Sequence, residues 1–506
     1  MSDEHERGAF RWICTLARKM GAKSFLVEDA FDRLNVSQEL SYLWDNCDPG
    51  DRHGDVRAVA ITFLSKGPKS KQADVSQSVI AQAILITFPR NGIQQSYVFE
   101  ASIRLPSRGR TAKPLLNNYL PLARDLKILV SEKEYSFKGI YFCEQNGTTT
   151  LCAHSALKVV AHAAFNRKIP AKEIQELLGG DVVQAGGVKT DHLMEAFQKL
   201  GLNAVLYNFK PSGKKRLGEE ENPWPVLCSA IEAGHPALLI VETQDKGITH
   251  VLPVLGYTLN SDEWHPHASD SYRTKQTDFL SSSEWIDHLI INDDLMGPLY
   301  CLSQSWLKRT HRETRLTPSS PTAKNPSLGG LRPRGIITLA PDQIEISAPV
   351  AEKCAYESMQ MLLPELNTGW NIKGRWWRYL VDKKPRVVFR TTVAEKQHYL
   401  DHLMKMHGSK QSQQVSSLML HLHNTLPDVF WLSEVSLPNL YAGNRAKLGE
   451  VCIRISDRNF VSHLDTVVGF RFPGIVGFRE GDYLTADTWG LNGHSRFVGD
   501  SALDEW

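Results

Sequence analysis

The sequence predicts an α+β protein built from three modules and one linker. Strand patterns dominate its first part, whereas helix and strand patterns alternate in the rest. A polar stretch rich in Pro, Ser and Thr lies at 311–333, and this composition is typical of a linker. We therefore divide the chain into a mainly β N-terminal module at 1–135, an α+β central module at 136–310, and an α+β C-terminal module at 334–506.

The N-terminal module is predicted from one helix pattern and several strand patterns. Its clearest feature is a hairpin, because Asn91 and Gly92 separate two runs rich in β-formers, and Asn-Gly favours the tight turn of a hairpin. No set of residues in this module suggests catalysis. The predicted elements are a helix within 1–20 and strands at 24–28, 56–64, 78–88 and 94–105.

Composition restricts the class of protein. The 58 basic and 56 acidic residues give a net charge of +2, which is too balanced to favour nucleic acid or a lipid surface as partner. The N-terminus lacks the apolar core of a signal peptide, and no apolar run reaches the length of a membrane span. The eight cysteines form no CxxC pair, so we expect reduced thiols, a cytoplasmic location and neither a structural metal nor a cofactor.

A cysteine in the central module lies where a buried helix is expected to begin. Cys152 would lie in the first turn, after the possible N-cap threonines at 148–150, where the helix dipole favours a thiolate. Gln145, seven residues upstream, carries an amide that could stabilise an oxyanion. The helix is indicated by apolar residues three and four apart: Ala153, Ala156, Leu157, Val160, Ala161, Ala164 and Phe165.

A histidine and a carboxylate follow in the same module. His250 begins an apolar strand pattern, and Asp293 ends another. A catalytic imidazole needs an acceptor on its second nitrogen, and Asp293 could be that acceptor. Asn292 and Asp294 are alternatives, because the alternation of side chains along a strand decides which of the three faces the histidine. A nucleophile, a base and an orienting group are what acyl transfer through a thiol requires.

The central module resembles papain-like cysteine peptidases over about 140–300, in the bacterial form that trims double-glycine leader peptides. The resemblance implies Cys152 as nucleophile, His250 as base, Asp293 as the residue that orients the histidine, and Gln145 as oxyanion donor. The motifs that carry it are Gln145 before Cys152-Ala153-His154-Ser155-Ala156-Leu157, then Gly234-His235-Pro236, His250 with Gly256-Tyr257, and Asp293 with Gly297.

We therefore expect a cysteine protease or isopeptidase that acts on a protein or peptide through a thioester acyl-enzyme. Two alternatives stay open: an acyl transferase or deamidase that uses the same triad, and a catalytically inactive scaffold that binds a partner. The flanking modules are expected to select or position the substrate rather than to do chemistry.

Three other features are interpreted as structural. His154 and His162 fall off the apolar face of the Cys152 helix, so we expect them to face solvent. Cys143 is expected to be a strand cysteine rather than the redox partner of Cys152. The pair His265 and His267 lacks neighbouring ligands at metal-binding spacing, so a metal site there is not expected.

Overall fold

The computed structural model describes residues 8–46, 55–66, 78–90, 92–105, 118–145, 152–179, 188–208, 223–242, 249–259, 279–304, 332–340, 344–372, 374–407, 413–455, 463–488 and 495–498. Contacts divide the chain into two units. Unit 1 comprises 1–221, 235–257 and 288–339, and unit 2 comprises 222–234, 258–287 and 340–506. Unit 1 thus includes the predicted N-terminal module and most of the predicted central module. Apart from 332 and 333, the predicted linker lies outside the described residues.

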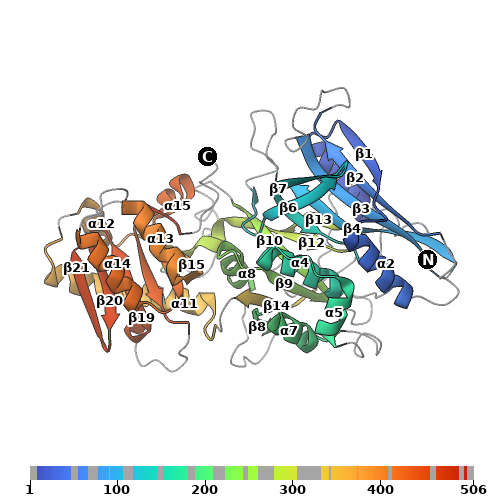
Figure 1. Cartoon of the computed structure of the whole chain (residues 1–506). Coiled ribbons are helices and arrows are strands. Elements are labelled where there is room, and N and C mark those ends of the chain that lie inside the picture. The colour runs from blue at the N-terminus through green and yellow to red at the C-terminus, as the bar shows by residue number, and fades with distance from the viewer. Residues whose placement is uncertain are drawn as a thin grey trace. The chain divides into compact units, whose positions relative to one another are not determined.

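A six-stranded antiparallel sheet forms the N-terminal part of unit 1 (Figure 1). The predicted hairpin is confirmed: its strands pair directly, with Pro89 opposite Gln94 next to the turn. The sheet order is β1-β2-β3-β4-β7-β6, with bounds β1 Ser24–Asp29, β2 Arg57–Leu64, β3 Val79–Arg90, β4 Ile93–Arg104, β6 Arg124–Val130 and β7 Lys133–Phe142.

Two helices cover opposite faces of this sheet. Helix α1 (Ala9–Lys19) packs with Ile61 and Phe63 of β2, whereas α2 (Leu34–Asn46) packs with Ala58 and Ala60 of the same strand. Odd and even residues of a strand point to opposite faces. Both faces are therefore covered at β2 and β3, which explains the near-continuous apolar runs in these strands, whereas exposed residues alternate along the outer strands β1 and β6.

The second sheet of unit 1 contains the strands on which His250 and Asp293 lie. Its order is β13-β12-β10-β9-β14-β8, and β5 (Asn118–Tyr119) also pairs with β10. Helix α4 (Cys152–Phe165) packs against this sheet with α5 (Ala171–Leu178) and α7 (Thr190–Lys199). The other strands are β8 Asn203–Asn208, β9 Ala237–Glu242, β10 Thr249–Leu259, β12 Ile286–Asp293, β13 Gly297–Ser303 and β14 Arg332–Ala340.

Unit 2 is built on a seven-stranded sheet with the order β11-β15-β16-β18-β19-β20-β21. Every neighbouring pair is antiparallel except β11 with β15, which is parallel. The strands are β11 Phe279–Ser281, β15 Val387–Glu395, β16 Val429–Ser436, β18 Gly449–Ile453, β19 Val467–Phe472, β20 Ile475–Glu480 and β21 Tyr483–Thr488.

Helices cover both faces of the unit 2 sheet (Figure 1). Trp431 and Val435 of β16 pack with α11 (Ala348–Gly369) and α12 (Arg375–Lys383). Phe430 and Leu432 of the same strand pack with α13 (Lys396–His407) and α14 (Gln413–Thr425). Odd-numbered residues of β16 contact one pair of helices and even-numbered residues contact the other pair. Unit 2 therefore has three layers, with the sheet between two layers of helices.

The α+β class predicted from the sequence is confirmed, but some elements belong to different parts than expected. Strand β11 falls within the predicted central module, yet it pairs with β15 of unit 2. The helix predicted near 225–233 is α8 (Pro223–Glu232), which packs in unit 2. Residues 334–340, expected in the C-terminal module, lie in β14, which pairs with β9 of unit 1. No helix among the described residues is long and apolar enough to cross a membrane.

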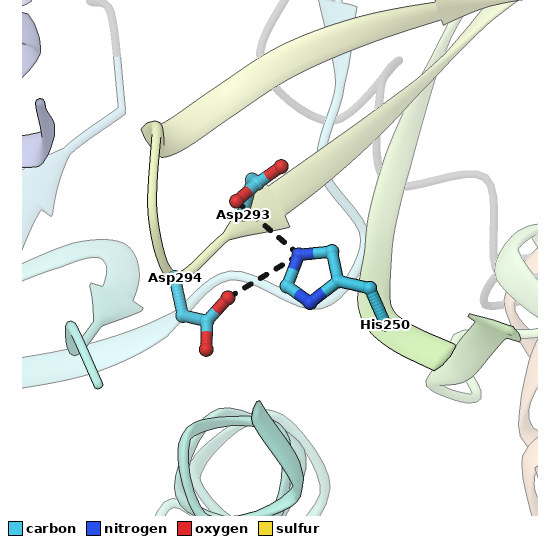
Figure 2. A group of neighbouring side chains, drawn as sticks. All are labelled: His250, Asp293 and Asp294. Carbon is cyan, nitrogen blue, oxygen red and sulfur yellow. Dashed lines mark hydrogen bonds and ion pairs between the residues drawn. The ribbon is translucent and has the colours of Figure 1, made fainter. Parts of the chain in front are cut away.

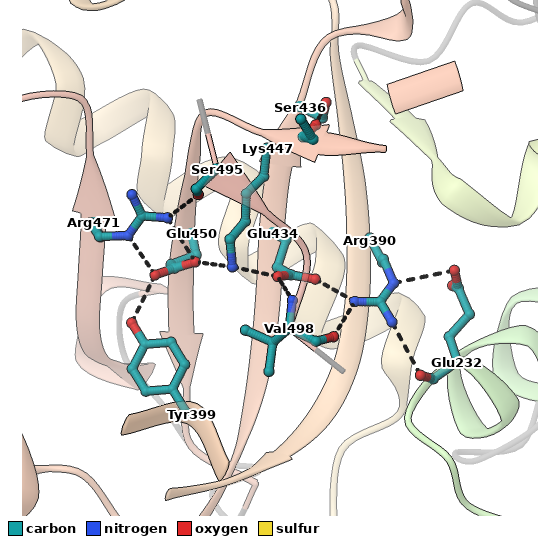
Figure 3. A network of polar contacts seen from close by, with 11 residues as sticks. Glu232, Arg390, Tyr399, Glu434, Ser436, Lys447, Glu450, Arg471, Ser495 and Val498 are labelled. Carbon is teal, nitrogen blue, oxygen red and sulfur yellow. Dashed lines mark hydrogen bonds and ion pairs between the residues drawn. The ribbon is translucent and has the colours of Figure 1, made fainter. Parts of the chain in front are cut away.

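A row of buried charges crosses the unit 2 sheet (Figure 3). Arg390 of β15 lies opposite Glu434 of β16, which lies opposite Glu450 of β18, which lies opposite Arg471 of β19. Lys447 pairs with both glutamates. Each of the two glutamates therefore has two cationic partners.

Candidate active site

Cys152 is the first residue of α4, so its thiol lies in the first turn of the helix, as the sequence predicts. The predicted N-cap threonines lie outside the described residues. The side chain is half-buried, and its sulfur lies 4.0 Å from the carbonyl oxygen of Thr249. Thr249 immediately precedes His250 in β10, so the thiol reaches the strand that carries the histidine.

His250 is buried between the thiol and two carboxylates. Its Nε2 lies 3.4 Å from Asp293 Oδ1 and 3.3 Å from Asp294 Oδ1 (Figure 2). An interaction with the side chain of Cys152 is among the causes that raise the pKa of His250, so the thiol lies close to the imidazole. Since Nε2 faces both aspartates, Nδ1 is the nitrogen left to face the thiol. Three of the predicted site residues, Cys152, His250 and Asp293, therefore come together.

The three candidates at the end of β12 differ in what they contact. Asn292 turns to the backbone, where it donates to Tyr141 O at 3.1 Å and accepts from Leu299 N at 3.2 Å. Asp293 and Asp294 both reach the histidine, because the strand ends at Asp293 and a turn follows. The alternation of side chains along a regular strand therefore cannot decide which of these two carboxylates faces His250.

Backbone donors fix the carboxylate of Asp293. Its Oδ1 accepts from the amide of Leu295 at 2.9 Å and from that of Met296 at 3.2 Å. This local turn is the kind that Asp favours, since the side chain takes the place of a backbone acceptor. Asp293 is therefore better held than Asp294, whose oxygens accept no hydrogen bond from any other described residue.

The electrostatics of the cluster distinguish the two carboxylates. Burial opposes ionisation of Asp293, but the charge of His250 and three hydrogen bonds outweigh it and lower the pKa. Burial raises the pKa of Asp294 to about 6, with His250 opposing and Asp293 adding to the rise. Burial lowers the pKa of His250, yet both aspartates and its hydrogen bonds hold that pKa well above 6.5. The arrangement therefore favours transfer of a proton to His250, which would give an imidazolium beside ionised Asp293.

Gln145, the fourth predicted site residue, lies three positions beyond the end of β7 and is half-buried. Among the described residues, no hydrogen bond joins it to Cys152, His250 or Asp293.

Glu144, the residue before Gln145, was not predicted from the sequence as part of the site. Glu144 accepts from the amide of Val98 at 2.7 Å, and burial raises its pKa to about 8, with the charge of Asp294 adding to the rise.

The expectation that His154 and His162 face solvent is wrong. Both side chains are buried, and burial lowers the pKa of each to about 4. The reason is that α4 has two covered faces. Its apolar face packs on the second sheet, and its polar face meets the N-terminal part, where Lys158 pairs with Glu39 at 3.1 Å and His162 stacks on Tyr141.

Helix α1 holds the turn that follows the two aspartates. The indole of Trp12 donates to Pro298 O at 2.6 Å and stacks on Tyr300 with 4.7 Å between ring centroids. Gly297 has φ +122°, and a Cβ added there would lie 2.7 Å from Trp12 Cδ1. The N-terminal helix therefore supports the position of Asp293, a link between distant segments that the sequence did not indicate.

Gly297→Ala is expected to lower the midpoint of thermal unfolding more than Gly21→Ala does. Both glycines have positive φ, where a side chain costs about 1–3 kcal/mol, but only Gly297 lies against a neighbour. No heavy atom lies within 4 Å of a Cβ added at Gly21, so this variant measures backbone strain alone. Equal shifts in the two variants would contradict a close contact between Trp12 and the turn.

No protein-family model matches this chain, and neither does any curated protein. Its function is therefore inferred from the geometry around Cys152.

Proposed function

We propose that the chain is a papain-like thiol hydrolase, a cysteine protease or isopeptidase acting on a protein or peptide. The observation that carries this proposal is the meeting of a helix-start thiol, a buried imidazole and a fixed carboxylate at Cys152, His250 and Asp293. The order of contacts is thiol, imidazole, carboxylate, which is the order that nucleophile, base and orienting group require.

Each residue would have one role in the reaction. His250 Nδ1 takes the proton of Cys152, and the sulfur attacks the scissile carbonyl carbon to form a tetrahedral oxyanion. When this intermediate collapses, the C–N bond breaks, the imidazolium gives its proton to the leaving amine, and a thioester remains. Water then loses a proton to His250, attacks the thioester and releases the carboxylic acid and the thiol. Gln145 is the candidate donor to the oxyanion.

The surrounding fold supports this assignment. A helix that begins at the nucleophile packs against an antiparallel sheet that carries the base and the orienting carboxylate on β10 and β12. This is the arrangement that the resemblance to papain-like peptidases implies. The presence of all three groups in contact favours an active enzyme over an inactive scaffold.

A reducing compartment is consistent with this chemistry. Every cysteine in the described part of the chain is a free thiol. Cys143 contacts Ser155, and burial raises its pKa to about 11, so it is a poor nucleophile near the site. We propose a cytoplasmic protein in which Cys152 is the reactive thiol.

A thiol-directed electrophile tests the proposal. An epoxysuccinyl or vinyl-sulfone probe is expected to label Cys152, with mass-spectrometric mapping of the modified peptide. Labelling should disappear in Cys152→Ala and survive in the matched variant Cys143→Ala. Equal labelling of the two variants would contradict the assignment. Product analysis on a glutamine-bearing protein then separates peptide hydrolysis from deamidation.

A further inference from the structure

We propose that His250, Asp293 and Asp294 also bind a divalent cation of the zinc type, and that this cation switches the thiol off. The three side chains each offer one ligand atom, and these atoms all lie within 4.8 Å of one another. The binding site stands on this geometry alone. Only the effect on the thiol rests on the proposed function.

The distances fit a metal site better than a pair of hydrogen bonds. Good N–H···O bonds measure about 2.7–3.2 Å. Zinc lies about 2.0–2.2 Å from His nitrogen and carboxylate oxygen, so two ligands at a tetrahedral angle are about 3.3–3.5 Å apart. The observed separations from His250 Nε2 are 3.4 Å to Asp293 and 3.3 Å to Asp294. The imidazole and each carboxylate are thus spaced as neighbouring ligands of one tetrahedral ion.

Buried carboxylate oxygens in this cluster lack donors. Asp293 is 1 % exposed and Asp294 is 4 % exposed. Neither Asp293 Oδ2 nor either oxygen of Asp294 accepts a hydrogen bond from another described residue, and of these three oxygens Asp294 Oδ1 alone has an ion-pair partner there, His250. Figure 2 shows both carboxylates directed at the same nitrogen of His250. A buried charged oxygen without a partner is costly, and a cation held by both aspartates would remove that cost.

The ligand set selects the kind of cation. One imidazole nitrogen and two carboxylates suit zinc, which takes nitrogen and oxygen ligands and often leaves a fourth position open. Magnesium and calcium prefer oxygen ligands throughout, so a site built on an imidazole discriminates against them. The set therefore fits a borderline transition-metal ion rather than an alkaline-earth ion.

Metal binding and thiol activation exclude each other at His250. In the proposed reaction Nε2 carries a proton toward the aspartates and Nδ1 is free to accept the proton of Cys152. A metal on Nε2 leaves the single proton of the neutral ring on Nδ1, which then has no lone pair to accept another. The cation therefore inhibits by occupying the nitrogen that orients the base.

The site is tested by calorimetric titration of ZnCl2 into the full chain carrying Cys152→Ala, which removes the thiol as a possible ligand. A competing chelator keeps weaker surface sites empty. We expect one site, weakened at least tenfold by Asp294→Asn and unchanged by Asp191→Asn at an exposed position. MgCl2 should give no binding. Equal zinc affinity of the parent and Asp294→Asn would overturn the site.

The inhibition is tested on the chain with Cys152 intact. ZnCl2 should slow probe labelling of Cys152, and a chelator should restore it. The ratio of rates with and without zinc should approach one in Asp294→Asn. Undiminished inhibition in that variant would mean that zinc acts on the thiol directly, which overturns the switch. If Cys152 is not labelled even without zinc, the proposed function fails, whereas the calorimetric result still decides the metal site.

Discussion

Replacing Lys447 with methionine is expected to destabilise unit 2 by about 3–5 kcal/mol, the usual cost of leaving a buried ion pair without one partner. Lys447 is fully buried and pairs with Glu434 and Glu450, which lie directly opposite each other on β16 and β18. Methionine has a similar length but no charge. Denaturant unfolding followed by tryptophan fluorescence measures the loss.

The direction of the effect follows from the surroundings of Glu450. Burial raises the pKa of this carboxyl, but Arg471 and Lys447 together lower it far below its usual value. Glu450 therefore adds stability above the ordinary carboxyl pKa of about 4.3, and this stability is lost as the pH falls toward the lower folded-state pKa. Without Lys447 the folded-state pKa rises, so acid unfolding should begin at a higher pH.

Lys353→Met is the matched control within the same unit. Lys353 is largely exposed and pairs with Glu357 one turn along α11, an arrangement that contributes about 0.3–0.5 kcal/mol. Its free energy of unfolding should change by less than about 1 kcal/mol. If Lys447→Met were as mild as this control, the row of charges would contribute little to the stability of the sheet.

His250→Ala is expected to slow probe labelling of Cys152 by about 10²- to 10⁴-fold, the usual contribution of a positioned general base. The alanine variant removes both the acceptor of the thiol proton and the group that connects the thiol with Asp293. Labelling rates are measured at neutral pH by mass spectrometry of the intact chain.

His162→Gln serves as the control for this loss. His162 lies on the same helix as Cys152 and is also buried, but it stacks on Tyr141 rather than facing the thiol. Its variant should keep a labelling rate within about threefold of the wild type. A similar fall in both histidine variants would point to a general disturbance of α4 and would count against His250 as the base.

The parts of the site predicted correctly are those with a local pattern in the chain. The helix that begins at Cys152 follows from apolar residues three and four apart, and the His250 strand follows from a continuous apolar run. In each case the spacing of the apolar residues shows which face of the helix or strand is buried. Neither pattern predicts that the helix and the strand lie in contact. That expectation depended on the resemblance to papain-like peptidases.

The parts that were missed depend on contacts between distant segments. The buried side of α4 with His154 and His162 is covered by the N-terminal part, which no spacing within the helix reveals. The placement of β14 depends on pairing with β9, almost one hundred residues earlier in the chain. Asp293 and Asp294 could not be separated because the chain turns directly after the strand.

Each unit is built from several separate segments of the chain, so a single continuous fragment cannot contain a whole unit without parts of the other. Arg390 binds Glu232 of α8 at 3.3 Å and also the carbonyl oxygen of Val498. A fragment that starts at residue 340 would lack α8 and β11, so Arg390 would lose Glu232 as a partner and β15 would lose its parallel neighbour. During synthesis α8 leaves the ribosome well before β15 and Val498, so the contacts of Arg390 can form only after Val498 has been added.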